Sequence, residues 1–395
     1  MREHVRTVKL KKNEDRRIRA GHLWIFSNEI ANLDQRFAPG EIVDIATHAG
    51  GFVGRGYINP QSLISVRVLT RNKEAIDQKF FKKRIARALA LRRRVLPEEQ
   101  SYRVVFGEAD GLPGLIIDKY ADVLVLQVST LGMQMRLGEI LGALPAVGLS
   151  SRALVLRADT PMAELEGFSG ESRVLGGDLE LPVRIEQDGL FFDVDVLEGQ
   201  KTGFYLDQRE NRRCVSGLFR GLRVLDCFCY TGAWSLYAGK AGAKQVLGID
   251  TSTHAIEIAR RNTNLNSLGS TCRFERADAF EKLNELVQRG EKMDCVILDP
   301  PALVKSKRHL KQGEAAYERV NRLAMKLVVS EGLLISCSCS FHISCERFSQ
   351  ILSASARKSR RSALLIEWRG QARDHPTLLA MPETAYLKCA VMRIA

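Results

Sequence analysis

The stretch VLDCFCYTGA, residues 224–233, decides the fold of the largest part of this chain. It predicts a buried strand over 223–227 that turns at once into a helix over 233–241. A dinucleotide-binding turn would carry three glycines here to seat a pyrophosphate on the helix N-terminus, and only Gly232 is present. The turn therefore indicates a ligand without a pyrophosphate, whose carboxylate and amine would meet an acidic side chain and backbone N–H groups.

Strands and helices alternate on both sides of this turn. The predicted strands that follow cover 245–249, 272–274, 293–298 and 333–337, and the predicted helices cover 253–264, 279–289 and 315–329. Such alternation predicts an α/β fold with a doubly wound parallel sheet. In this class of sheet, ligands bind at the carboxyl ends of the strands.

Acidic residues end three successive strands of the predicted sheet, at Asp226, Asp250 and Asp278. The second can accept both hydroxyls of a ribose, and the third suits an adenine amino group. Each acid alone could instead cap a helix, as Asp250 could before a helix that starts near Ser252. Together they predict a site for S-adenosylmethionine. We expect its lining to include Asp226, Phe228, Tyr230, Thr231, Gly232, Asp250, Ser252, Asp278, Ala279 and Asp299.

The fourth strand runs into Asp299, Pro300, Pro301 and Ala302. Two prolines hold the backbone rigid, so Asp299 and main-chain groups can be presented to a planar base. This pattern is typical of nucleobase methyltransferases. An aromatic residue normally follows the prolines in those that methylate an amino group, so Ala302 argues against an exocyclic nitrogen as the methyl acceptor.

The fifth predicted strand contains Cys337 and ends near Cys339. A thiol beside Asp299 fits methylation at carbon 5 of a pyrimidine, because that carbon is a poor nucleophile until a thiolate has added to carbon 6. Asp299 would then hold ring N3 and stabilise the adduct. Buried cysteines usually serve as small hydrophobic residues, and we expect this role for Cys337.

All nine cysteines lie at or beyond Cys214, which favours one domain with reduced thiols over a disulfide framework. The pairs Cys227/Cys229 and Cys337/Cys339 lie on separate strands, which disfavours a zinc site, and we expect no metal. No run reaches the ~20 apolar residues of a membrane span, and the basic stretch at 1–20 is not followed by an apolar one, so we expect no signal peptide. We therefore expect a cytoplasmic protein without a membrane partner.

The chain of 395 residues, 45% of them hydrophobic, can bury the cores of two or three domains. Its net charge of +13 favours an anionic partner, either nucleic acid or an acidic membrane surface. Basic residues gather in an N-terminal arm that includes Arg2 and in a predicted helix over 73–96. Those of the helix are Lys79, Lys82, Lys83, Arg84, Arg87, Arg92, Arg93 and Arg94. Two interpretations of these clusters stay open: an ordinary solvated charged surface, or a surface that contacts phosphates.

The composition pattern divides the chain into three parts. Short strands broken by glycines predict a small β-barrel over 1–72, and a mixture of strands and one helix predicts a compact α+β domain over 73–186. The α/β sheet domain then covers 187–395.

Four further stretches are long and specific: GHLWIF at 21–26, GRGYINP at 54–60, EADGLPGLIID at 108–118 and KTGFYLDQR at 201–209. With the strand-end motifs, they make the chain resemble the family of ribosomal RNA large subunit methyltransferase I, which are cytosine-5 methyltransferases of large-subunit rRNA. The resemblance runs over the whole length.

The resemblance implies a PUA barrel at 1–72, a central EEHEE-like α+β domain at 73–186 and a seven-stranded, Rossmann-like class I methyltransferase domain at 187–395. It implies that Gln208 and Arg209 help to bind S-adenosylmethionine and that Cys339 stands at the nucleophile position. The implied substrate is 23S rRNA, as free RNA or in an assembling subunit. Many other RNA cytosine-5 methyltransferases have a second cysteine where this chain has Pro301.

Two alternatives stay open at this point. One is an rRNA guanine N2 or N7 methyltransferase on the same fold, which the Asp-Pro-Pro motif permits and which Ala302 and Cys339 disfavour. The other is a non-catalytic RNA-binding factor, which the three strand-end acids disfavour. We expect a monomer or a homodimer in each case.

Overall fold

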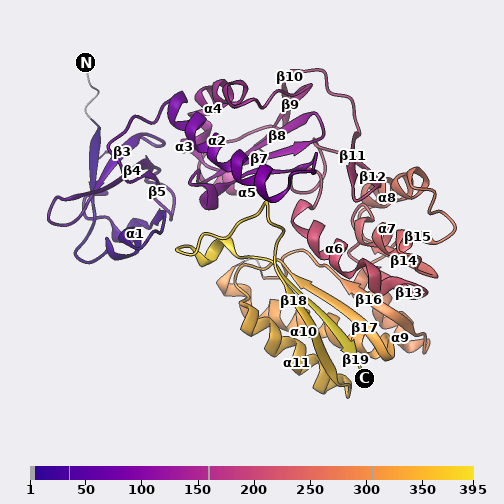
Figure 1. Ribbon diagram of the computed structural model, residues 1–395. Coiled ribbons are helices and arrows are strands. Elements are labelled where there is room, and N and C mark those ends of the chain that lie inside the picture. The colour runs from indigo at the N-terminus through magenta and orange to yellow at the C-terminus, as the bar shows by residue number, and fades with distance from the viewer. Residues whose placement is uncertain (1–4, 35, 159–160, 305) are drawn as a thin grey trace. The chain divides into compact units, whose positions relative to one another are not determined.

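The computed structural model describes residues 5–34, 36–158, 161–304 and 306–395, and Figure 1 shows the course of the chain. The chain forms two compact units. The first unit comprises Met1–Val183, Val194–Leu206 and Arg373–Thr384, and the second unit comprises Arg184–Asp193, Asp207–Ala372 and Ala385–Ala395. Arg2 of the predicted basic arm lies outside the described residues. The boundaries at 72 and 186 stay a prediction.

The first unit begins with a five-stranded sheet in the order β1-β3-β4-β5-β2. Its elements are β1 (Arg6–Lys9), α1 (Arg16–Arg19), β2 (Trp24–Ile25), β3 (Ile42–Ala46), β4 (Phe52–Ile58) and β5 (Val66–Thr70). Val43, Ile45, Val66 and Val68 alternate along β3 and β5 and are fully buried. Gly56 lets β4 approach β5, because a Cβ there would lie 2.1 Å from the carbonyl oxygen of Arg67.

A second five-stranded sheet, in the order β10-β9-β8-β7-β6, completes the first unit. Its strands are β6 (Tyr102–Phe106), β7 (Leu115–Tyr120), β8 (Val123–Val128), β9 (Ala153–Arg157) and β10 (Arg173–Gly177). Its helices are α2 (Gln78–Val95), α3 (Leu131–Gln134), α4 (Leu137–Ala143) and α5 (Pro161–Leu165). The predicted α+β arrangement is confirmed for this part of the chain.

Helix α2 begins at Gln78 and not at residue 73, because the Asp77 side chain caps it by accepting a hydrogen bond from the Phe80 N–H at 3.0 Å. The basic face that we predicted for this helix needs one correction. Arg92 is fully buried and does not belong to it. The exposed members are Lys79, Lys82, Lys83, Arg87, Arg93 and Arg94, with Arg84 half-buried.

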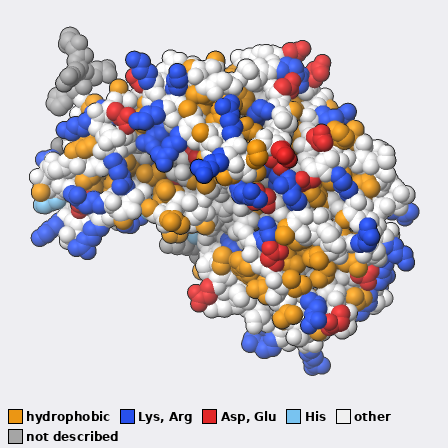
Figure 2. Space-filling model, viewed as in Figure 1, with side chains coloured by type: hydrophobic (Ala, Val, Ile, Leu, Met, Phe, Trp, Pro, Cys, Tyr) orange, Lys and Arg blue, Asp and Glu red, His pale blue; other side chains and the backbone are white. Residues whose placement is uncertain are grey.

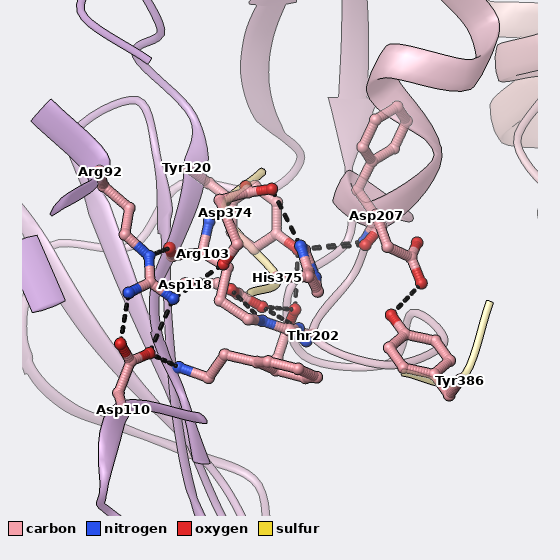
Figure 3. A network of polar contacts seen from close by, with 12 residues as sticks. Arg92, Arg103, Asp110, Asp118, Tyr120, Thr202, Asp207, Asp374, His375 and Tyr386 are labelled. Carbon is pink, nitrogen blue, oxygen red and sulfur yellow. Dashed lines mark hydrogen bonds and ion pairs between the residues drawn. The ribbon is translucent and has the colours of Figure 1, made fainter. Parts of the chain in front are cut away.

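Arg92 points inward because acceptors inside the first unit surround its guanidinium (Figure 3). It donates two hydrogen bonds to the Asp110 carboxylate, at 2.5 and 2.7 Å, and one to the carbonyl oxygen of Asp374 at 2.8 Å. Arg103 pairs with Asp118 at 2.8 and 2.7 Å, and its backbone N–H donates to the Asp374 carboxylate at 2.9 Å. Buried charges in this network are thus paired and hydrogen-bonded.

The second unit is built on a seven-stranded sheet in the order β15-β14-β13-β16-β17-β19-β18. Its strands are β13 (Arg223–Cys227), β14 (Gln245–Asp250), β15 (Cys272–Arg276), β16 (Met293–Leu298), β17 (Val328–Ser338), β18 (Ala363–Arg369) and β19 (Lys388–Ile394). The strands from β13 to β17 are parallel, and β19 runs antiparallel between β17 and β18. The predicted doubly wound α/β sheet is confirmed.

Helices connect these strands (Figure 1). They are α6 (Arg209–Val215), α7 (Ala233–Lys240), α8 (Thr253–Leu265), α9 (Ala279–Gln288), α10 (Leu310–Leu327) and α11 (Cys345–Ser359). Helices α9, α10 and α11 share one apolar core with the sheet, which includes Leu283, Val320 and Phe348. Two short strands, β11 (Val183–Gln187) and β12 (Leu190–Val194), pair with each other. No helix among the described residues is long and apolar enough to cross a membrane.

Candidate active site

The carboxyl ends of the parallel strands meet at one edge of the seven-stranded sheet, as the strand registers require. Cys227 of β13 pairs with Ile249 of β14 and with Leu298 of β16, and Leu298 pairs with Ser336 of β17. The segments that follow these residues therefore leave the sheet side by side. They carry Asp250, Asp299 and Cys339. Asp226 is the next-to-last residue of β13, and Asp278 follows β15, which is parallel to β14. We call this region the carboxyl edge.

The loop between β13 and α7 has an unusual backbone. Phe228 and Tyr230 adopt positive φ angles of 64° and 49°, and Gly232 has a φ of 84°. Positive φ is uncommon for residues other than glycine and costs roughly 1–3 kcal/mol, so it marks a constrained loop. Gly232 also needs its lack of a side chain, because a Cβ would lie 2.8 Å from the Phe274 ring.

Asp250 ties this loop to the next one. Its carboxylate accepts hydrogen bonds from the backbone N–H groups of Tyr230 and Ser252, both at 3.0 Å. The helix-cap interpretation of Asp250 is wrong, since Ser252 caps α8 by accepting from the Ala255 N–H at 3.2 Å. Asp250 instead holds the left-handed loop that follows β13 against the end of its own strand, β14.

Asp278 does cap a helix. Its Oδ1 accepts from the N–H groups of Phe280 and Glu281, at 2.9 and 3.0 Å, at the start of α9. Ala279, the first residue of α9, is buried behind it. The capping bonds use only Oδ1 of this carboxylate. Asp278 also lies just beyond the end of β15, as predicted.

Asp226 is fully buried at the end of β13, and its two oxygens differ. Oδ2 accepts from the backbone N–H and the hydroxyl of Ser235, at 3.0 and 2.7 Å. Oδ1 has no hydrogen-bond partner among the described residues, and neither has the buried hydroxyl of Thr231. Burial, and then the nearby charges of Asp299 and Asp250, raise the pKa of Asp226 to about 7.

Asp299 is held by two side chains of the second unit. Gln208 donates through Nε2 to both carboxylate oxygens at 3.0 Å, and Trp234 donates through its indole N–H to Oδ2, also at 3.0 Å. Asn211 in turn donates to the Gln208 Oε1 at 2.6 Å, which fixes the direction of the Gln208 amide. The predicted residues Gln208 and Asp299 thus lie in direct contact.

Two neighbours of Gln208 are also placed. Arg209 is fully buried at the first position of α6. Asp207, just before it, accepts a hydrogen bond from the Tyr386 hydroxyl within the second unit (Figure 3). The segment that enters the second unit is therefore anchored at the carboxyl edge.

Cys339 lies just past the end of β17 and is partly exposed. Its Sγ lies 3.7 Å from the carbonyl oxygen of Pro300, so the thiol adjoins the Asp-Pro-Pro segment. Ser340, the next residue, is fixed by two bonds to its hydroxyl, from the Val304 N–H at 3.1 Å and with the Tyr317 hydroxyl at 2.9 Å. The structure thus brings Cys339 and Asp299 to neighbouring strand ends.

Cys337 is buried, whereas Cys339 is partly exposed. Cys337 is fully buried inside β17, opposite Cys389 of β19. Burial raises the pKa of its thiol well above the ordinary value. An inaccessible, protonated thiol is a packing residue, which is the role that we expected for Cys337.

Sequence reasoning missed three residues of the carboxyl edge. Trp234 lies in the first turn of α7, one residue beyond the motif that we interpreted, and only the folded loop turns its indole toward Asp299. Asn211 acts through Gln208, and Lys388 reaches the edge from β19, a strand that the sequence did not reveal. An aromatic N–H donor directly after the predicted turn was the one available signal.

Comparisons with known proteins identify the family of this chain. Residues 8–71 match the model of a PUA-like domain, and residues 126–388 match that of S-adenosylmethionine-dependent methyltransferases. The chain is 38% identical to ribosomal RNA large subunit methyltransferase I of Shewanella denitrificans and 39% identical to the protein of that name from Shewanella amazonensis. Each comparison covers 98% of this chain and 99% of the relative.

Solved structures show the same fold. A putative SAM-dependent methyltransferase from Streptococcus mutans superposes with a TM-score of 0.85 at 19% identity, and a putative methyltransferase complexed with SAH superposes with 0.86 at 18% identity. Both comparisons cover 98% of this chain and 100% of the other. The fold is that of a PUA-like domain joined to an S-adenosylmethionine-dependent methyltransferase.

Proposed function

The chain belongs to the family of ribosomal RNA large subunit methyltransferase I, and from this premise we propose that it methylates carbon 5 of a cytosine in 23S rRNA through a covalent adduct. Cys339 is the proposed nucleophile, and S-adenosylmethionine is the methyl donor. The observation that carries the proposal is the partly exposed Cys339 thiol beside Pro300, one residue from Asp299. A thiol in that place serves pyrimidine carbon 5 and has no evident use in guanine methylation.

The residues at the carboxyl edge fit S-adenosylmethionine. Asp226 Oδ1 and the Thr231 hydroxyl are buried polar atoms without a partner among the described residues, and each such atom costs roughly 1–3 kcal/mol. A bound amine or hydroxyl would remove that cost. We assign Asp226 to the amine, Arg209 and the N–H groups of 228–232 to the carboxylate, Asp250 to the ribose and Asp278 to the adenine. The cofactor supplies an activated methyl group on a sulfonium.

The remaining lining residues shape this site. Phe228 and Tyr230 give the loop its left-handed backbone, and Gly232 lets it pass close to Phe274. Ser252 caps α8, and Ala279 is the first residue of α9. Gln208 contributes by fixing Asp299.

The proposed chemistry begins when the Cys339 thiol loses its proton to solvent. The thiolate adds to carbon 6 of the cytosine, and N3 takes a proton from solvent. The electron pair at carbon 5 then takes the methyl group from the sulfonium, whose bonding pair would stay on sulfur as a thioether. Carbon 5 and N3 then lose their protons to solvent, the double bond between carbons 5 and 6 is restored, and the bond between carbon 6 and sulfur breaks with its electron pair left on the Cys339 thiolate. The net change in the base is the replacement of the hydrogen at carbon 5 by a methyl group.

Asp299 would hold the ring during these steps. Three N–H bonds from Gln208 and Trp234 fix the orientation of its carboxylate, so an N3–H of the adduct would meet an acceptor that needs no rearrangement. Ala302 leaves the space after the prolines without the aromatic ring that stacks on a base in amino-group methyltransferases.

The first unit would hold the RNA. Lys and Arg side chains spread over the barrel and the part around α2, with few Asp and Glu between them (Figure 2). The target base must leave its stack, at a cost of a few kcal/mol, and salt-dependent phosphate contacts by a separate surface can offset that cost. We further propose that the protein acts in the cytoplasm, as a monomer or a homodimer, on free 23S rRNA or on an assembling subunit.

Trapping of the adduct tests the mechanism. Large-subunit rRNA transcripts that contain 5-fluorocytosine should form a covalent complex with the protein, because fluorine cannot leave carbon 5 as a proton does. The complex should disappear in Cys339→Ala and persist in Cys337→Ala, its matched control. A wild-type protein that methylates rRNA without forming a complex would favour guanine N2 or N7 as acceptor. A protein that binds RNA but no cofactor would be a non-catalytic factor.

A further inference from the structure

Lys388 is a buried lysine that the proposed chemistry has not used. It is the first residue of β19, and only 2% of its surface is exposed. Its Nζ donates hydrogen bonds to the carbonyl oxygens of Ser340 at 2.7 Å and Tyr386 at 2.8 Å. Lysines are almost never fully buried unless a partner compensates the charge.

No carboxylate supplies that compensation. Among the described residues, none of the acidic side chains lies within ion-pair distance of Lys388. Burial accordingly lowers the pKa of Lys388 to about 8, at which the amine is still mainly protonated at neutral pH. Two carbonyl dipoles are a weak substitute for a counter-charge, so the site holds a cation that is poised to stabilise an anion.

The Cys339 thiol is the group placed to become that anion. Lys388 stands opposite Ser338 in the β17–β19 ladder, and its Nζ contacts the carbonyl of Ser340, so it touches the chain on both sides of Cys339. Negative charge on Cys339, and then on Cys345, would raise the pKa of Lys388. Because such an interaction is mutual, the ammonium must favour the thiolate of Cys339 to the same extent.

We propose that Lys388 is the positioning residue for the nucleophile, with its buried ammonium serving as the counter-charge of the Cys339 thiolate. The inference rests on the proposed function in that Cys339 is taken as the attacking group. The thiol proton leaves to solvent on the exposed side of Cys339, and sulfur keeps the electron pair for carbon 6. The same ammonium stabilises the thiolate again when the finished base is released.

Other titratable groups around the pair make this counter-charge necessary. Asp299 lies on the adjoining Asp-Pro-Pro segment, and a negative charge there opposes a thiolate. Tyr317 of α10 and Cys345 of α11 bring no positive charge, and Cys337 and Cys389 are buried thiols on β17 and β19. Lys388 is a cation that β19 contributes here, and its Nζ contacts the chain next to Cys339.

The rate at which iodoacetamide alkylates Cys339, followed as a function of pH by peptide-resolved mass spectrometry without RNA, tests the proposal. An ordinary cysteine has a pKa of about 8.5, and the wild-type profile should have its midpoint below that value. In Lys388→Met the midpoint should rise by about one pH unit or more, with about a tenfold slower reaction at pH 7. Lys388→Arg should restore most of the shift.

Two control variants separate charge from architecture. Ser340→Ala removes the hydroxyl contacts to Val304 and Tyr317 but leaves the ammonium, so its midpoint should match the wild type. Lys292→Met removes an exposed lysine that bonds the carbonyl of Lys326, and it should change nothing. A wild-type midpoint at or above 8.5, or equal profiles for wild type and Lys388→Met, would overturn the proposal.

The wild-type measurement decides even if Lys388→Met fails to fold. The result is also independent of the proposed function, because alkylation needs neither RNA nor cofactor. If Cys339→Ala still made 5-methylcytosine, the proposed function would fail. The pH dependence of Cys339 alkylation would still show whether Lys388 stabilises the thiolate.

Discussion

Two polar regions of this protein are buried to the same degree and are built in opposite ways. In the first unit, Arg92 with Asp110, Arg103 with Asp118 and Arg67 with Glu166 form ion pairs whose side chains are at most 6% exposed. At the carboxyl edge of the second unit, Asp226 Oδ1 and the Thr231 hydroxyl have no partner among the described residues, and Lys388 has no carboxylate.

We interpret the paired groups as holding the fold and the unpaired ones as groups that a ligand would complete. In a complete network each charge is compensated by its partner. Removal of one partner lowers the free energy of unfolding by about 3–5 kcal/mol. An incomplete network is costly in the free protein and is retained where binding or catalysis completes it. The comparison therefore predicts that damage to the first unit lowers stability and that damage to the carboxyl edge lowers activity.

The largest expected effect is on activity, at the carboxyl edge. Cys339→Ala should reduce methyl transfer to 23S rRNA by at least about 10⁴-fold, because loss of a nucleophile abolishes the covalent route. The free energy of unfolding and the affinity for S-adenosylmethionine should stay near the wild-type values, since the side chain is partly exposed. Radiolabelled methyl transfer and calorimetry measure these quantities. Cys337→Ala is the matched control. It should still form the adduct, and its affinity for the cofactor should be near the wild-type value or lower.

The next effect is on stability, in the first unit. Arg92→Met leaves the Asp110 carboxylate without its bidentate partner and should lower the free energy of unfolding by about 3–5 kcal/mol. Arg93→Met, on the exposed side of the same helix, should change it by less than about 0.5 kcal/mol. Chemical denaturation decides, and equal stability of the two variants would remove the structural half of the comparison.

Asp226 should make cofactor binding depend on pH. Its pKa of about 7 in the free protein means that the carboxyl is largely protonated below neutrality, whereas a cationic amine favours the ionised form. Binding then releases a proton, so affinity should fall by up to about tenfold for each pH unit below 7 and level off above it.

Calorimetry between pH 5.5 and 7.5 in buffers of different ionisation heat measures both the affinity and the proton release. Asp226→Asn should bind more weakly and lose most of this dependence. A wild-type affinity that stays constant over the range would show that Asp226 does not face the amine. The same raised pKa makes the free protein less stable as pH rises between the ordinary value of 3.8 and about 7, because the native state holds the proton that the unfolded state has lost.

The smallest effect concerns RNA affinity. Arg87→Ala removes one exposed charge of α2 and should weaken RNA binding severalfold at low salt, with a salt dependence shallower by about one phosphate contact. The unfolding free energy should not change, in contrast to Arg92→Met on the same helix. Filter binding over a series of salt concentrations measures the slope, and a slope equal to that of the wild type would place the RNA elsewhere.

These two arginines also show how far the sequence could lead. Arg92 lies seven residues after Ile85 on a stripe with Ala88 and Leu89, a spacing that puts it on the buried side of α2. Its charge suggested the solvent face instead, and only its distant partners, Asp110 and Asp374, explain its burial. Helical periodicity therefore predicted the buried side of α2 for Arg92 correctly, whereas its residue type did not.

At the carboxyl edge, the parts that follow from local pattern were predicted. Strands β13 and β16 have the predicted bounds, because a buried parallel strand is a continuous apolar run with a sharp end. Asp226, Asp250, Asp278, Asp299 and Cys339 stand at the strand ends as expected. Trp234, Asn211 and Lys388 escaped prediction because each acts through a partner from another element.

The identity of the methylated nucleoside tests the central claim most directly. Unmodified large-subunit rRNA would be incubated with the protein and S-adenosylmethionine that carries a trideuterated methyl group, digested to nucleosides and analysed by mass spectrometry. The account predicts the full label in 5-methylcytidine with wild type and with Cys337→Ala, and none with Cys339→Ala. Label in a methylguanosine, or in 5-methylcytidine with Cys339→Ala, would contradict it.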